Sequence, residues 1–404
     1  MQKKENRIGK ELAILILVSM SAGFVFFERM SVNYLFAHME ITSTQLGTLG
    51  SAFALAFAVG AAFCGSVIGK LGIKRTAAIF IILMGIVSFC QSLITSFAGL
   101  VALRILSGLV CGPVIPVAGT ILNESISGKR RGLFIGIMQG LSPALFSATI
   151  APVVLTAIAD SYGWQKSYWV MIAPCIVISL LILKFYDPDA MKPSFSQDEG
   201  EMHESAEKSA YRDLFRDKTY PFSFLLSTFT VCSYVLSLTY MPSYLAMARS
   251  NDYTSAEQTL ILTGLGFGGM LWGVLATGLS DKFGRKQILI PAYAICALGF
   301  LLVLGVTVTP IMLVAILTLT YTLQGSNSIA MSILPGDSLK SSVAIAKGIG
   351  FNQFSGEIIG GVGMMMLAGY LADNFSPAIP IYMAIGCAAV CLLLSSIMKN
   401  PSIH

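Results

Sequence analysis

Charge is scarce in this chain. Only 12% of its 404 residues are Asp, Glu, Lys or Arg, whereas 55% are hydrophobic, and the mean hydropathy is +0.76. A soluble domain ordinarily carries about 25% charged residues, so the composition excludes a soluble globular protein. The net charge of +5 does not indicate a nucleic-acid partner, because the basic residues are gathered in short loops between apolar runs.

Residues typical of catalytic and metal centres are also few. The three histidines lie near loops or the terminus, and the eight cysteines all lie within apolar runs without the spacing of a zinc site. The sequence contains no phosphate-binding glycine loop and no nucleophile elbow. We therefore expect no enzyme activity, no metal and no other cofactor, and we interpret the cysteines as small packing residues.

Long apolar runs are abundant instead. A helix needs roughly 20 apolar residues to cross the hydrocarbon core, and the alternation typical of a membrane barrel is absent. The sequence predicts twelve spanning helices, at 11–37, 46–69, 76–97, 98–123, 132–158, 167–186, 220–247, 257–280, 287–307, 309–334, 344–372 and 377–398.

The basic residues fall on alternate loops. They stand at both termini, after the even-numbered runs and in the polar stretch 187–219, whereas the opposite loops hold only Lys166 and Arg249. By the positive-inside rule, both termini and the 187–219 stretch are expected in the cytoplasm. The expected location is the plasma membrane, the inner membrane in a bacterium, with the protein a monomer in the lipid bilayer.

The polar stretch 187–219 divides the chain into two halves of six runs each. It reads as a solvated linker between an amino-terminal bundle, 1–186, and a carboxyl-terminal bundle, 220–404. The halves echo each other, since GSVIGKLGIKR (65–75) follows the second run and GLSDKFGRK (278–286) follows the eighth. Such internal repeats are typical of secondary transporters.

Two ionisable residues lie inside the first apolar run. Glu28 and Arg29 stand where a charge costs roughly 2.5–3.5 kcal/mol on insertion scales, and residues of this kind usually face a bundle interior or a water-filled cavity. They indicate either a functional site or a structural ion pair that joins the first helix to a neighbour.

The repeated loop resembles the signature of the major facilitator superfamily, a glycine and an acidic residue followed by a basic-rich loop. The second copy departs little, and the first lacks an acid at Gly69 and a basic residue at Ile73. The resemblance implies two pseudo-symmetric six-helix bundles in an all-α membrane protein, and these loops as conformational-switch elements: Gly65, Lys70, Gly72, Asp281, Lys282, Gly284, Arg285 and Lys286.

A narrower resemblance is to the anion:cation symporters, the group of sialin and the sugar-acid permeases. It is carried by FERMSVNYLFA (27–37), YMPSYLA (240–246) and GFNQFSGEIIGGVGMMMLAGYLAD (350–373). It implies that Glu28, Arg29 and Asn352 line a substrate cavity. The group's second protonatable glutamate falls on Cys111, so its two-carboxylate coupling is in doubt for this chain.

Chemistry adds further candidates in the amino-terminal half. Arg29 carries a planar fork of donors suited to a carboxylate, Asn33 shares its helix face, and Glu28 points about 100° away, toward a neighbouring helix or Arg104. Arg104 is a candidate for proton coupling, or a residue packed against backbone carbonyls. Gln139 is either a reader of substrate hydroxyls or a polar link between helices.

The carboxyl-terminal half offers amides and one acid. Gln324 and Asn327 lie in the tenth run, and Asn352, Gln353 and Glu357 in the eleventh. Gln353 and Glu357 share a helix face. Glu357 is a second candidate for the coupled proton, because burial favours the neutral form of a carboxyl group.

These observations favour a secondary active transporter that takes up a small organic anion, a sugar acid or other carboxylate, together with a proton by alternating access. The alternative is a proton-driven exporter of drugs or metabolites. A membrane sensor or lipid-handling protein is the third hypothesis, and its distinguishing feature, a sizeable soluble domain, is not present in this sequence.

Overall fold

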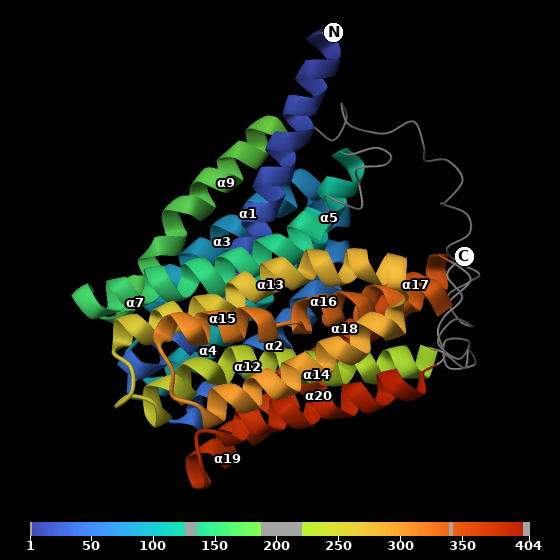
Figure 1. The fold of residues 1–404 in the computed structure, drawn as a ribbon. Coiled ribbons are helices and arrows are strands. Elements are labelled where there is room, and N and C mark those ends of the chain that lie inside the picture. Colours follow the sequence, from blue (N-terminus) through green and yellow to red (C-terminus); the bar gives the residue numbers. More distant parts are fainter. Residues whose placement is uncertain (1, 126–133, 135, 187–219, 339–341, 399–404) are drawn as a thin grey trace. The chain divides into compact units, whose positions relative to one another are not determined.

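The computed structural model describes residues 2–125, 134, 136–186, 220–338 and 342–398 (Figure 1), and the predicted linker at 187–219 lies outside them. Every regular element in these ranges is a helix. Eleven helical segments of the described ranges are long and apolar enough to cross a membrane. Contacts between residues divide the chain into two units, 1–41 with 48–195, and 42–47 with 196–404.

The helices of the first unit follow the predicted runs closely. Short π-helical and 3₁₀ segments interrupt its fifth and sixth spans. The elements are α1 (Gln2–Met39), α2 (Ser43–Leu71), α3 (Ile73–Gln91), α4 (Phe97–Cys111), α5 (Val114–Ser125), η2 (Ile137–Leu141), η3 (Ala144–Ile150), α7 (Ala151–Tyr162), α8 (Trp164–Ser167), η4 (Tyr168–Met171) and α9 (Ile172–Phe185). Only the first turn of α2, 42–47, groups with the second unit.

The second unit repeats this composition of elements. Two of its spans also contain π-helical segments. The elements are α12 (Tyr220–Ala248), α13 (Ser255–Phe283), α14 (Arg285–Gly305), α15 (Pro310–Thr320), α16 (Leu323–Ser328), η5 (Ile329–Ile333), α17 (Leu334–Ser338), α18 (Ser342–Ser355), η6 (Gly356–Met364), α19 (Met365–Asn374) and α20 (Ile379–Ile397).

The tenth span explains why eleven helical segments of spanning length serve a twelve-helix fold. α15 ends at Thr320, and Tyr321 leaves the helical conformation with a ψ of 46° before α16 begins. The Thr322 hydroxyl near the break donates to the Ala292 carbonyl, at 2.6 Å. The apolar run 309–334 is therefore helical in pieces, a backbone feature that hydropathy does not detect.

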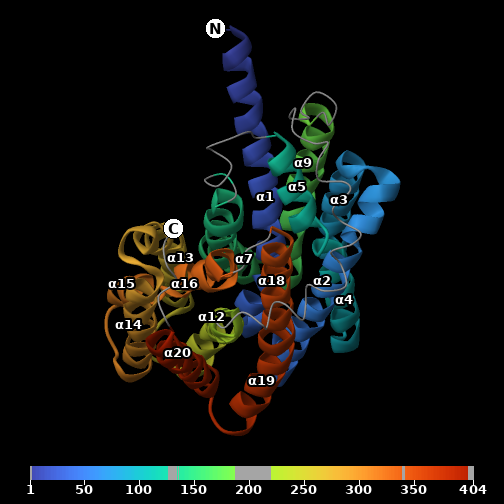
Figure 2. The same ribbon diagram turned by 90° about the vertical axis from the view of Figure 1, so that its right-hand side faces the viewer.

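α1 and α12 are the most buried helices of their units. Within their most apolar windows, 67% and 72% of the residues are buried, against 33% for the span that holds α9. α12 lies beside α20 in both views (Figures 1 and 2). Its hydroxyls bind neighbouring helices, as when Ser233 donates to the Ala384 carbonyl at 2.8 Å. Polar links of this kind hold membrane helices together where no hydrophobic force acts between them.

The two repeated loops share a backbone conformation. Gly72 has φ 76° and ψ 152°, and Gly284 has φ 96° and ψ 151°. Both stand between two helices in a region that L side chains rarely adopt. The predicted equivalence of the two loops is therefore confirmed in their backbone.

The second loop is also tied by charge. The Arg285 guanidinium pairs with Asp281 and, at 2.9 Å, with Asp337 near the end of α17, and the Lys286 ammonium donates to the Ser396 carbonyl at 2.6 Å. In the first loop, Gly69 occupies the place of the acid, so no carboxylate from that position reaches the exposed Lys70. The ion pair of Arg285 with Asp281 in the second loop therefore has no counterpart at position 69 of the first.

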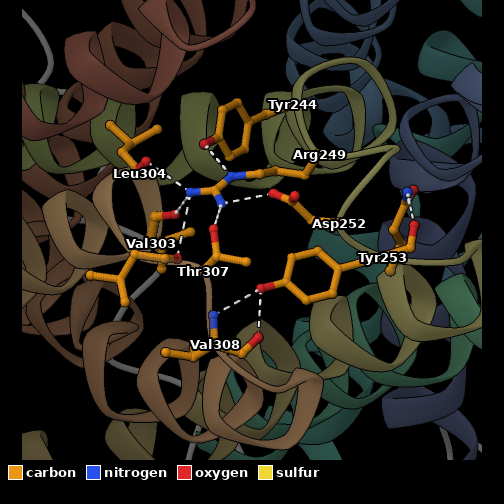
Figure 3. A network of polar contacts seen from close by, with 10 residues as sticks. Tyr244, Arg249, Asp252, Tyr253, Val303, Leu304, Thr307 and Val308 are labelled. Atoms are coloured by element: carbon orange, nitrogen blue, oxygen red, sulfur yellow. Dashed lines mark hydrogen bonds and ion pairs between the residues drawn. The ribbon is translucent and has the colours of Figure 1, made fainter.

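Arg249 follows α12 and fixes two loops of the second unit (Figure 3). Its guanidinium donates to the Val303 and Leu304 carbonyls at 3.1 and 2.9 Å, to the Thr307 hydroxyl at 2.8 Å and to Asp252 at 3.0 Å. The carbonyls are orphan acceptors at the end of α14, where a cation also interacts favourably with the helix dipole. This basic residue, an exception to the positive-inside pattern, is thus a helix cap.

Replacing Arg249 by Gln should destabilise the second unit by about 1–3 kcal/mol, because hydrogen bonds to a charged group are lost and buried carbonyls stay unpaired. The measurement is the midpoint of thermal unfolding of the purified protein in detergent. Lys166→Gln is the matched control. Lys166 is the other basic residue of the loops opposite the basic-rich ones, and its side chain is exposed. Equal midpoints for the two variants would contradict the capping role.

Candidate functional site

Glu28, in the middle of α1, is fully buried and surrounded by donors. Its carboxylate accepts hydrogen bonds from Gln91 Nε2 at 2.5 Å, Ser88 Oγ at 2.8 Å and Ser107 Oγ at 3.0 Å. Arg104 Nη1 lies 3.5 Å from Glu28 Oε1. A buried carboxylate is costly without such partners, so α3 and α4 supply the solvation that the hydrocarbon cannot.

Arg104 packs against backbone carbonyls, as one of its two predicted interpretations has it, and its role in proton coupling stays a prediction. Besides the ion pair, its guanidinium donates to the backbone carbonyls of Glu28 at 2.9 Å and Arg29 at 2.7 Å, and it stacks 4.7 Å above the Phe53 ring. The prediction that Glu28 points toward Arg104 is confirmed. Arg104 therefore binds the backbone of two adjacent residues of α1 at once.

Arg29 faces a different environment from Glu28. Its side chain is 9% exposed, and its guanidinium lies 5.9 Å from the centre of the Phe57 ring. Asn33, one turn further on, is buried and donates to Met30 Sδ at 3.1 Å. The permanent cation thus lies against an aromatic ring on one side of α1, and the acid lies among hydroxyls and amides on another.

Close glycine contacts place α4 against α2 next to this cluster. A Cβ on Gly108 would lie 2.4 Å from the Phe53 carbonyl oxygen, and one on Gly60 would lie 2.4 Å from the Leu109 carbonyl oxygen. Only glycine permits this approach. It brings the Phe53 ring within stacking distance of Arg104.

Cys111 lies beside the same carboxylate. It is fully buried on α4, one turn after Ser107, and is close enough to Glu28 and Arg104 to interact with both electrostatically. This is the position where the resemblance places a second acid. In this cluster Glu28 is thus the carboxyl group, and the position of the expected second acid holds the thiol of Cys111.

Gln139 belongs to the π-helix η2 and has an exposed side chain. Next to it, the Ser142 hydroxyl donates to the Ser19 carbonyl and joins this span to α1. π-Helical turns are rare and occur frequently at functional sites. The amide at position 139 is thus exposed, while Ser142 provides the link between helices.

Asn352, expected to line a substrate cavity, is fully buried in the second unit. Its Oδ1 accepts from the Tyr220 hydroxyl at 3.3 Å, and its Nδ2 lies 3.4 Å from both Ser223 Oγ and the Met331 carbonyl oxygen. In this conformation the amide links α18 to α12 and η5. A ligand would have to exchange these hydrogen bonds to reach it.

Glu357 lies in the π-helix η6 and is 5% exposed. The exposed amide of Gln353 donates to its Oε1 at 3.2 Å. The predicted pairing of these residues on one helix face is confirmed. Glu357 is thus a second buried carboxylate, in the second unit.

The α16 segment contributes further polar atoms. Gln324 is 7% exposed, and the neighbouring residues Ser326 and Asn327 each have a buried oxygen, Oγ and Oδ1, without a hydrogen-bond partner among the described residues. Buried polar atoms normally have partners. These oxygens are therefore candidates for contact with a ligand.

Sequence reasoning missed Ser88, Gln91 and Ser107. A signal was present, because Ser88 and Gln91 are three residues apart in a run otherwise fit for lipid, and Ser107 is three residues after Arg104. Polar residues at this spacing share a helix face. What they face depends on packing between helices, which spacing does not give.

Within the described ranges, no group of three His, Cys, Asp or Glu side chains is arranged to hold a metal ion. The first unit can hold a proton and a permanent cation side by side on one helix. The second can offer a further carboxyl group and several amides. This combination suits binding and release of an anion and a proton.

Curated relatives of the chain are carriers of small molecules. It is 26% identical over 365 residues to the probable sulfoacetate transporter SauU of Cupriavidus necator, covering 84% of this chain and 79% of that protein. It is 24% identical over 395 residues to the probable galactarate/D-glucarate transporter GudP of Bacillus subtilis, covering 89% and 84%. It is 26% identical over 277 residues to the cis,cis-muconate transport protein of Acinetobacter baylyi, covering 67% of this chain and 64%, less than two thirds, of that protein.

Solved structures agree on the fold. The nucleoside transporter NupG aligns with a TM-score of 0.75 at 13% identity, covering 96% of this chain and 99% of that one. A bacterial homologue of the human lysosomal transporter Spinster aligns with a TM-score of 0.68 at 15% identity, covering 97% and 95%. The model of the Major Facilitator Superfamily matches residues 12–363. This multi-pass membrane protein is therefore a transporter, not an enzyme, and it belongs to the Major Facilitator Superfamily.

Proposed function

We propose that the protein imports a small organic anion together with a proton by alternating access. The observation that carries the proposal is the pair on α1, a fully buried carboxyl group at Glu28 next to the buried cation of Arg29. Relatives named for sulfoacetate, galactarate or glucarate, and muconate support an anionic substrate. All of these are small and negatively charged at neutral pH.

Arg29 is the proposed anchor of the substrate. Its guanidinium stays charged at any relevant pH and offers a planar fork that matches a carboxylate or sulfonate. The Phe57 ring beside it keeps the site poor in water, which strengthens the attraction. In the first unit, Gln139 is the proposed amide for further oxygens of a sugar acid or other carboxylate, with Asn33 in support. The proposed polar contacts of the second unit are Gln324, Asn327, Asn352 and Gln353.

Glu28 is the proposed carrier of the proton, with Arg104 as its partner and Glu357 in support. Arg104 donates both to the Glu28 backbone carbonyl and to that of Arg29. A substrate that moves the backbone at Arg29 along with its side chain also shifts the cation that favours the ionised form of Glu28. This gives one carboxyl group a way to link the anion to the proton.

Arg29→Lys should fold but bind anions at least about tenfold more weakly, because the bidentate fork is lost while the charge is kept. Uptake and binding of cis,cis-muconate, D-glucarate and sulfoacetate by purified protein in proteoliposomes measure the effect. Arg75→Lys is the control, since Arg75 is an exposed arginine of the first repeated loop. Unchanged uptake by Arg29→Lys for every anion that the wild type carries would remove Arg29 as the anchor.

Glu28→Gln should abolish proton-driven accumulation while leaving counterflow exchange of substrate, which needs no net movement of protons. The fixed neutral amide cannot release or accept the proton. Glu357→Gln, the matched variant in the second unit, should reduce both activities only modestly. Both are measured with an imposed pH gradient and with preloaded vesicles. Accumulation against a gradient by Glu28→Gln would make the Glu28–Arg104 pair a structural lock.

The proposed orientation places both termini and the 187–219 linker in the cytoplasm of a bacterial inner membrane, on the ground of the basic loops. An epitope tag inserted near Gly200 should resist external protease in intact cells and be cleaved after permeabilisation. A tag in the Arg249–Thr254 loop should behave in the opposite way. Cleavage near Gly200 in intact cells would reverse the orientation.

A further inference from the structure

Ser88, a fully buried residue of α3, has one hydroxyl proton and two acceptors within reach. Its Oγ lies 2.8 Å from Glu28 Oε2 and 3.3 Å from the Tyr168 carbonyl oxygen at the start of η4. A hydroxyl can donate its proton in one direction and accept a hydrogen bond from another. Ser88 therefore stands between a carboxyl group and a backbone carbonyl that can each take its hydrogen bond.

The other partners of Glu28 all donate to its ionised form in the contacts observed, and of these Ser107 is the one hydroxyl, which can also accept a hydrogen bond. Arg104 carries donors and no acceptor, Gln91 presents its Nε2 at 2.5 Å, and Ser107 donates at 3.0 Å. Among the described residues, Cys111, Tyr168 and Cys175 also interact electrostatically with the carboxylate, and Arg29 follows it on α1. A neutral Glu28 carries an O–H that needs an acceptor in this dry environment.

We propose that Ser88 is the positioning residue that lets Glu28 change its protonation state inside the first unit. When Glu28 is ionised, Ser88 donates to Oε2. When Oε2 carries a proton taken from solvent, that O–H donates to Ser88 Oγ, and the Ser88 hydroxyl turns to the Tyr168 carbonyl. No covalent bond of Ser88 forms or breaks, and both states keep their hydrogen bonds.

This inference rests on the proposed role of Glu28 as the proton carrier. Because Ser88 can accept a hydrogen bond from the protonated carboxyl group, Glu28 can take up a proton without burying an unpaired O–H. Gln91 is the competing candidate, because its Oε1 is buried without a partner among the described residues, and rotation of the amide would turn that oxygen toward Glu28. The experiment separates the two residues.

The experiment is a pH titration of the purified protein by infrared difference spectroscopy, which needs no substrate. The carboxylic-acid C=O band of Glu28 is identified by its loss in Glu28→Gln. Gln91→Met removes a donor that serves only the ionised form, so the midpoint of this band should rise by about one to two pH units. Ser88→Ala removes a partner of both forms, so its midpoint should move by less than about one unit.

The band itself gives a second readout. In Ser88→Ala the protonated carboxyl group loses its acceptor, so the C=O band should move to higher frequency, and Ser88→Thr, which keeps a hydroxyl, should restore it. If Ser88→Ala raises the midpoint as much as Gln91→Met and leaves the frequency unchanged, Ser88 is a fixed donor and the proposal is wrong. If Gln91→Met leaves the midpoint unchanged and shifts the frequency instead, Gln91 is the switch and Ser88 is not.

A third result would also test the role of Glu28 as the proton carrier. If the wild-type protein shows no Glu28 acid band at any pH at which it stays folded, Glu28 does not carry the proton, and both the coupling role and the role of Ser88 fall. If the Glu28 band has the same frequency and the same midpoint in Ser88→Ala as in the wild type, only the role of Ser88 is overturned. The two failures are thereby distinguished.

Discussion

The solvation of one buried carboxylate organises the first unit of this transporter. Glu28 lies on the most enclosed helix of the unit, where neither water nor lipid satisfies its oxygens. Three uncharged donors and one guanidinium from α3 and α4 converge on it at 2.5 to 3.5 Å. Because each donor must point inward, the faces that α3 and α4 present to α1 are fixed. The glycine contacts of α4 with α2 then follow, since Arg104 must lie deep enough to reach α1.

Arg104 adds a buried positive charge to this cluster. A buried ion pair adds little stability when compared with well-packed apolar residues, so its presence on an otherwise apolar helix needs another explanation. Its guanidinium holds the backbone of Glu28 and of Arg29 together. Any change at the Arg29 backbone is thereby felt by the partner of Glu28, although the two side chains of α1 face different surroundings.

Much of the fold was predictable because membranes impose simple rules. Hydropathy located the spans, and repeated glycines gave equivalent loops whose conformations agree at Gly72 and Gly284. The direction of Glu28 toward Arg104 followed from the 100° turn of a helix. The break at Tyr321 was not predictable, because an apolar run looks the same whether or not its backbone is interrupted. The donors Ser88, Gln91 and Ser107 were missed because their roles depend on which helix packs against which.

The two units differ in their buried polar residues. In the second unit the predicted cavity residue Asn352 is already engaged with Tyr220, Ser223 and Met331, whereas Ser326 and Asn327 hold buried oxygens without partners among the described residues. In the first unit a thiol, Cys111, takes the place of a second acid. Under the proposal, the buried acid Glu28 and the adjacent buried cation Arg29 of α1 couple the anion to the proton without a separate carboxyl group. In the proposed mechanism, anion and proton act on the same turn of α1, and the hydrogen bonds around Glu28 link the two.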